Sequence, residues 1–170
     1  EDAAGVRVIS CPRTSLRPQA QTNANSGAGD KPRPVVDDLA VLTLGEIYQL
    51  TPERVKSYSV EGNSIHYEQA AAERAGFRAP LIGGGMGVHY LTAQMWHDRR
   101  PNSFAASIYF RRPIFWDEAV QVGVIEEGDS WTGMGLLKLL LAGTGTGTGA
   151  SQPAKVGTEL SLASYQLAQG

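Results

Sequence analysis

Large apolar residues are unevenly spread along the chain, and their distribution separates an N-terminal stretch from the rest. Between Pro12 and Pro34 the only large apolar residue is Leu16, which lies among many Pro, Gln, Asn, Ser and Gly residues. A stretch of this composition buries too little surface to offset the entropy that ordering would cost. We therefore predict a flexible N-terminal arm or linker over residues 1–38 and one globular domain over residues 39–170.

The first half of this domain has the pattern of three helices. Thr51-Pro52-Glu53 is a typical helix start, because threonine caps the first turn, proline fits its first position and the acid meets the positive end of the dipole. A second helix is predicted from near His66 to Ala75, followed by Gly76 as its stop. A third, from Met86 to about Trp96, is apolar on most sides, which predicts that it is buried.

The second half has the pattern of strands. Val120, Val122 and Val124 alternate with Gln121 and Gly123, as in a half-buried strand. Further strands are predicted around Val41–Ile47, Phe104–Phe110, Trp131–Leu141 and Val156–Leu167, and the repetitive segment Gly143–Gly149 is expected to be a hairpin loop. The predicted fold class is α+β, with an antiparallel sheet wrapped around a long central α-helix.

Composition excludes several classes of protein. The net charge of -2 gives no basic surplus for binding nucleic acid. Cys11 is the single cysteine, so the chain cannot form an internal disulfide or a thiolate metal cluster, and a reducing, cytoplasmic location is expected. No apolar run approaches the roughly 18 residues of a membrane span. The three histidines show no metal-ligand spacing, so we expect no metal and no cofactor.

Candidate chemistry is concentrated between residues 61 and 85. Glu61 precedes His66 by five residues, with Asn63 between them, and a carboxylate with an imidazole is a typical acid/base pair. Gly83-Gly84-Gly85 opens the third predicted helix, where free backbone N–H groups can stabilise a developing negative charge. This combination suits chemistry at a thioester carbonyl.

The order of these residues, from about Thr43 to Glu127, resembles a known family. The matching positions are Tyr58, Glu61, Asn63, Ile65, His66, Gly76, Phe77, Pro80, Leu81, Ile82 and Gly84, followed by the element Phe110–Glu118. They resemble the MaoC-like dehydratases, also called (R)-specific enoyl-CoA hydratases, whose motif is Tyr … Gly-Asp-x-Asn-Pro-(Ile/Leu)-His, an alanine-containing helix, and Gly-Phe-x-x-Pro-Ile-x-His-Gly-Met. This chain departs from the motif with Glu61 for Asp, Ser64 for Pro and Gly83 for His.

The resemblance implies a hot-dog fold and the reversible syn addition of water to a trans-2-enoyl thioester of coenzyme A or acyl carrier protein. It implies that Glu61 and His66 hold the water, that Asn63 positions one of them, and that the Gly84 N–H, or that of Gly85, binds the thioester oxygen. Four further residues are candidates for substrate binding. They are Thr92, for its hydroxyl, Met86, along the acyl tail, and the pair Arg111-Arg112, for the phosphates of coenzyme A.

Two alternatives remain open from the sequence. One is a hot-dog thioesterase, which would add water at the carbonyl instead. The other is a non-catalytic subunit that binds acyl thioesters or serves in assembly. Because a single hot-dog unit leaves a sheet edge open, the chain is expected to form a homodimer or to pair with a second hot-dog unit.

Overall fold

Five antiparallel strands form one sheet, in the spatial order β1-β3-β4-β5-β2. The computed structural model describes residues 32–59, 62–139 and 153–167. The strands are β1 (Leu42–Gln49), β2 (Pro101–Phe110), β3 (Ala119–Glu127), β4 (Ser130–Leu139) and β5 (Pro153–Leu167). The helices are α1 (Pro52–Ser59), α2 (Gln69–Arg74) and α3 (Gly84–Asp98), with 3₁₀ turns η1 (Leu39–Val41) and η2 (Ser64–His66). All of these elements belong to one compact unit, Arg33–Gly170.

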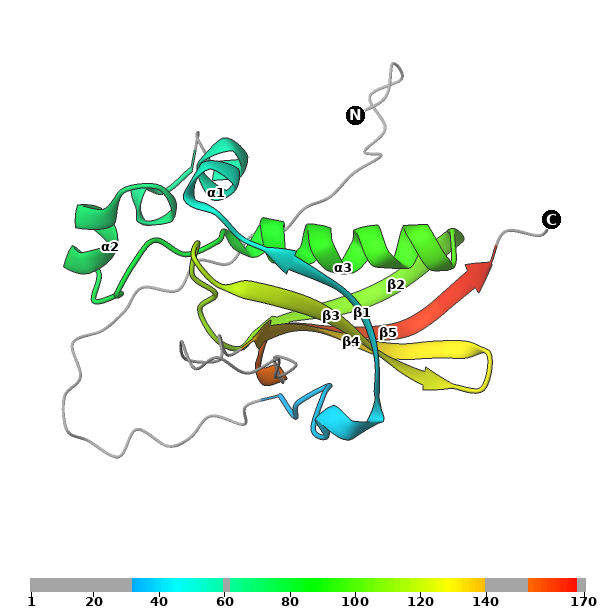
Figure 1. The fold of residues 1–170 in the computed structure, drawn as a ribbon. Coiled ribbons are helices and arrows are strands. Elements are labelled where there is room, and N and C mark those ends of the chain that lie inside the picture. The colour runs from blue at the N-terminus through cyan, green and yellow to red at the C-terminus, as the bar shows by residue number, and fades with distance from the viewer. Residues whose placement is uncertain (1–31, 60–61, 140–152, 168–170) are drawn as a thin grey trace, which may run out of the picture. The chain divides into compact units, whose positions relative to one another are not determined.

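Helix α3 lies along one face of the sheet, and α1 and α2 lie together near its first residues (Figure 1). The predicted α+β class is therefore confirmed, as are the existence and order of the predicted strands and helices. The predicted Gly143–Gly149 loop lies outside the described residues.

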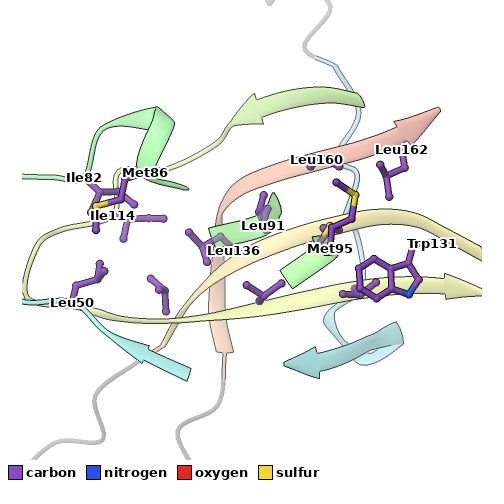
Figure 2. Packing of buried hydrophobic residues seen from close by; sticks show 14 of the residues in the cluster. Leu50, Ile82, Met86, Leu91, Met95, Ile114, Trp131, Leu136, Leu160 and Leu162 are labelled. Atoms are coloured by element: carbon purple, nitrogen blue, oxygen red, sulfur yellow. The ribbon is translucent and has the colours of Figure 1, made fainter. Parts of the chain in front are cut away.

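The core lies between α3 and the sheet. Leu91 and Met95 of α3 are almost fully buried, together with Leu136 of β4 and Leu160 of β5. Figure 2 shows these side chains gathered between the helix and the strands. Burying a side chain of this size stabilises the fold by about 1.5–3 kcal/mol. The contact fixes α3, and with it the glycines at its start, relative to the sheet.

The prediction that α3 is buried on most sides is wrong. Its buried residues are Met86, Gly87, Leu91 and Met95, which lie on a single face. Trp96 is 49% exposed, since no element in the described part of the chain covers the outer face of the helix. Apolar residues therefore occur on more faces of α3 than the described part of the chain buries.

The second predicted helix begins later than expected. His66 lies in the separate turn η2, and α2 starts only at Gln69. The cause is a local cap, because Asn63 Oδ1 accepts a hydrogen bond from the Ile65 N–H at 3.3 Å. The end agrees with the prediction, since Gly76 has a φ of 84°, which suits glycine after a helix.

Part of the predicted arm contacts the domain. Val35 and Val36 pack on the face of the sheet opposite α3, and a Cβ at Gly133 would lie only 2.6 Å from Val35 Cγ1. The buried carboxylate of Glu159 accepts hydrogen bonds from the Val35 N–H at 3.1 Å and the Val36 N–H at 3.3 Å. Residues 1–31 of the predicted arm lie outside the described residues.

Strand β2 forms one edge of the sheet, and no described strand pairs with its outer side. Most of its residues are exposed, including the apolar side chains of Phe104, Ile108 and Phe110. The outer faces of β2 and α3 thus leave apolar side chains uncovered in the single chain.

Candidate functional site

A groove of about 440 Å³ opens where the start of α3 meets the end of β2. Its walls come from four parts of the chain that are distant in sequence. They are His66, Phe77, Leu81, Ile82, Gly83, Gly84, Phe110, Arg111, Arg112, Pro113, Ile114 and Thr158. The predicted residues His66, Gly84, Arg111 and Arg112 are therefore brought together.

His66 is held in one orientation by a backbone carbonyl. Its Nδ1 lies 2.8 Å from the Leu81 oxygen, which can only accept, so Nδ1 carries the proton. In the neutral imidazole Nε2 is then an acceptor. Since His66 lines the groove and its Nε2 lies against Gly83, this free nitrogen is available to a ligand beside α3.

The segment that holds His66 is fixed from two sides. Leu81 forms a β-bridge with Phe115, and the Ile82 N–H donates to the Ile114 oxygen at 2.9 Å. Next to it, Arg78 makes a two-pronged ion pair with Asp117 at 2.7 and 2.8 Å. Those two hydrogen bonds hold the pKa of Asp117 below its usual value.

The three glycines form the start of α3. Gly83 is the N-cap, and no described residue accepts a hydrogen bond from the N–H of Gly84 or Gly85. Orphan N–H groups at the positive end of a helix dipole bind an anionic or carbonyl oxygen. Both glycines are exposed, so a ligand can reach them.

Gly84 is also close to an aromatic wall. A Cβ at this position would lie 2.8 Å from the ring of Phe110, which packs there from the end of β2. Any larger residue would push the ring away. The absence of a side chain at 84 therefore lets Phe110 cover the start of the helix.

The other candidate site residues have varied environments. Glu61 lies outside the described residues, so its distance from His66 stays a prediction. Asn63 caps the turn that presents His66. Thr92 donates its hydroxyl to the backbone oxygens of Val88 and His89, at 3.0 and 3.2 Å, and does not line the groove. Met86 is buried in the core.

The two arginines differ in their partners. Arg111 Nε lies 2.6 Å from the buried Glu159 carboxylate, and its Nη2 donates to the Arg33 oxygen at 2.8 Å. Arg112 is exposed, and its guanidinium has no partner among the described residues. Arg112 is therefore the better placed of the two to bind an anionic group of a ligand.

Phe110, Thr158 and Ser59 were not predicted from the sequence as site residues. Phe110 and Thr158 reach the groove from β2 and β5, and only the fold brings those strands to residue 84. Ser59 lies beside Gly83, and its place two residues before Glu61 was the available signal.

Within the described residues, no group of histidines, cysteines or acids is arranged to hold a metal ion. In the same part of the chain, no helix has the length and apolar character needed to cross a bilayer.

Comparison with known proteins finds similarity at the level of structure. No known protein-family profile matches the chain, and no curated protein matches it. The (R)-hydratase of A. caviae involved in PHA biosynthesis superposes with a TM-score of 0.50 at 14% identity, over 78% of this chain and 99% of that one.

Two Mycobacterium tuberculosis structures are also similar. HtdX has a TM-score of 0.58 at 17% identity, over 87% of this chain and 53% of its own, so the chain spans about half the length of HtdX. A chain of the ChsH1-ChsH2 complex has a TM-score of 0.50 at 8% identity, over 74% of this chain and 98% of that one. The hot-dog fold of the MaoC-like dehydratases and (R)-hydratases, implied by the resemblance, is thus confirmed.

Proposed function

We propose that the protein is an enoyl-thioester hydratase, acting reversibly as a 3-hydroxyacyl-thioester dehydratase. The observation that carries the proposal is the pairing of His66 with the start of α3. An imidazole lies with its Nε2 against Gly83, and neither this nitrogen nor the N–H groups of the next two residues have a hydrogen-bond partner among the described residues. The imidazole nitrogen suits proton transfer, and the backbone N–H groups suit the stabilisation of an oxyanion.

In the proposed reaction, water is held by His66 and by Glu61, the sequence-predicted partner. The water oxygen forms a bond to C3 of the trans-2-enoyl thioester and loses a proton to one of these two groups. The π electrons shift onto the thioester oxygen as an enolate, which the Gly84 or Gly85 N–H stabilises. A proton then reaches C2 on the same face, which completes syn addition.

The carrier of the acyl group is either coenzyme A or acyl carrier protein, and both present an anionic phosphopantetheine group. Arg112 lines the same groove as His66 and is exposed. A guanidinium binds phosphate well, so we assign Arg112 the contact to the carrier. Arg111 then has a structural role, because its ion pair with Glu159 holds it in the wall of the groove.

The functional unit is proposed to contain two hot-dog units, and we favour a second copy of this chain. The support is the open edge of β2 together with the exposed apolar residues Trp96, Phe104 and Ile108. An exposed apolar edge strand favours pairing with another strand.

Purified protein with crotonyl-CoA tests the proposal. Hydration is followed as loss of the enoyl absorbance, and free thiol is measured in the same sample. Loss of absorbance without thiol release supports the hydratase. Thiol release supports the thioesterase. If neither absorbance loss nor thiol release is observed, the result supports a binding or assembly subunit.

A further inference from the structure

The last turn of α1 places a buried hydroxyl beside His66. Ser59 is only 9% exposed, and its Oγ lies 3.8 Å from the point where a Cβ of Gly83 would be. The Nε2 of His66 lies 3.9 Å from that same point. Apart from Gly83 and its two chain neighbours, no other described residue has a heavy atom within 4 Å of it, so the two polar groups flank one small space over Gly83.

The Ser59 hydroxyl has no hydrogen-bond partner among the described residues, although it comes from a buried residue. No enclosed side-chain nitrogen or oxygen in the described part of the chain lacks a partner. The Ser59 oxygen is therefore not fully enclosed. Ser57, in the same helix, differs in this respect because its hydroxyl donates to the Glu53 oxygen at 2.8 Å.

The backbone of Gly83 does not itself require glycine. Its φ of -65° and ψ of 148° are open to any residue. A Cβ there would make only ordinary contacts with Ser59 and His66. Glycine at this position leaves a space between a hydroxyl and an imidazole that no described side chain fills, which suits a ligand oxygen.

We infer that Ser59 is a substrate-binding residue whose hydroxyl, with His66 Nε2, holds the oxygen that adds to C3. This inference rests on the proposed function and names a further residue for it. The oxygen is that of the water before addition and of the 3-hydroxyl afterwards. Its proton is donated to Nε2 while a lone pair accepts from Ser59, which orients the oxygen toward C3.

Two inert ligands isolate this contact. S-(3-hydroxybutyl)-CoA and S-butyl-CoA are thioethers that differ by one hydroxyl, and neither has the carbonyl that dehydration requires. Their dissociation constants are measured by titration calorimetry with the wild-type protein, Ser59→Ala and the matched control Ser57→Ala. The wild type should prefer the hydroxylated ligand by about five- to tenfold, the scale of one or two hydrogen bonds.

Ser59→Ala should lose most of this preference, and Ser57→Ala should retain it. Gly83→Ala, whose methyl fills the space while keeping both polar groups, should also lose it and still fold. An unchanged preference in Ser59→Ala, no preference in the wild type, or no binding of either ligand would each overturn the inference. Because binding is measured with unreactive ligands, the crotonyl-CoA assay can fail separately, which would overturn only the proposed function.

Discussion

At the scale of single residues, the orientation of His66 bears most directly on the proposed chemistry. A carbonyl acceptor at Nδ1 fixes the tautomer, which leaves Nε2 as the only nitrogen able to take a proton from a ligand. The motif predicted the residue, but only the fold provides Leu81 as its partner, fifteen positions later in the chain. The same is true of Ser59 and Gly83, which come together because α1 ends against the start of α3.

His66→Ala should reduce hydration of crotonyl-CoA by about 10² or more, the usual scale for losing a general acid or base. His89→Ala is the matched control, since His89 is exposed on α3 and does not line the groove. Steady-state kinetics with both variants makes the comparison. Equal rates for the His66 variant and the wild type would show that the imidazole has no part in proton transfer.

Gly84 permits a separate test of the backbone donor. Pro is favourable at the first position of a helix, so Gly84→Pro removes the N–H with little change to α3. Both Pro and Ala introduce a Cβ that meets the Phe110 ring, and only Pro deletes the donor. We expect Gly84→Pro to lower kcat at least about tenfold beyond Gly84→Ala, because an oxyanion donor acts mainly in the transition state. Matching values of kcat in the two variants would exclude the Gly84 N–H as the donor.

At the scale of elements, periodicity was sufficient to predict the strands and the helices but not their boundaries. The alternation over residues 120–124 predicted β3, and Thr51-Pro52 predicted the start of α1. The second helix was misplaced because the Asn63 cap separates η2 from α2, and a short polar side chain has several local hydrogen-bonding choices. Capping of this kind depends on geometry that the pattern of apolar residues does not contain.

The segment between α2 and β3 should show a dependence on pH through Asp117. Hydrogen bonds from Arg78 lower the pKa of Asp117, so the native state binds its proton less readily than the unfolded chain. The stabilisation is present above the unfolded pKa of about 3.9 and is lost as the pH falls through the lower native value. With both side chains about half exposed, it should amount to less than about 1 kcal/mol.

Asp117→Asn should therefore lower the free energy of unfolding at pH 7 by about 0.5 kcal/mol, with a smaller difference in acid. Urea denaturation of the wild type and the variant, at pH 7 and at acidic pH, measures the difference in the free energy of unfolding. Arg78→Met and the double variant complete a thermodynamic cycle. A destabilisation that does not change between neutral and acidic pH would show that the pair is not its source.

At the scale of the whole molecule, the sequence predicted the fold more fully than the site. A motif of about twenty residues and the order of elements were enough to predict the hot-dog fold. The groove also depends on Phe110 and Thr158, from strands that pair only after folding. The exposed face of α3 was not predicted, because periodicity shows which residues are apolar and not whether the same chain or a partner covers them.

The uncovered surface leads to a prediction about assembly. Ile108 lies on the open edge strand β2, and Ile47 lies on β1, the opposite edge of the sheet. The two isoleucines are 40% and 56% exposed, so lysine at either place should leave the folded single chain intact. If two copies pair through β2, a charge at 108 enters the interface unpaired, whereas a charge at 47 remains in solvent.

Light scattering at micromolar concentration should then give about twice the chain mass of 18.2 kDa for the wild type and for Ile47→Lys, but a single chain for Ile108→Lys. Circular dichroism on the same samples confirms that each variant is folded. If only Ile47→Lys dissociates, the pair forms through β1 instead. A wild-type monomer with full hydratase activity would mean that one hot-dog unit completes the site and that the apolar face of α3 and β2 has another purpose.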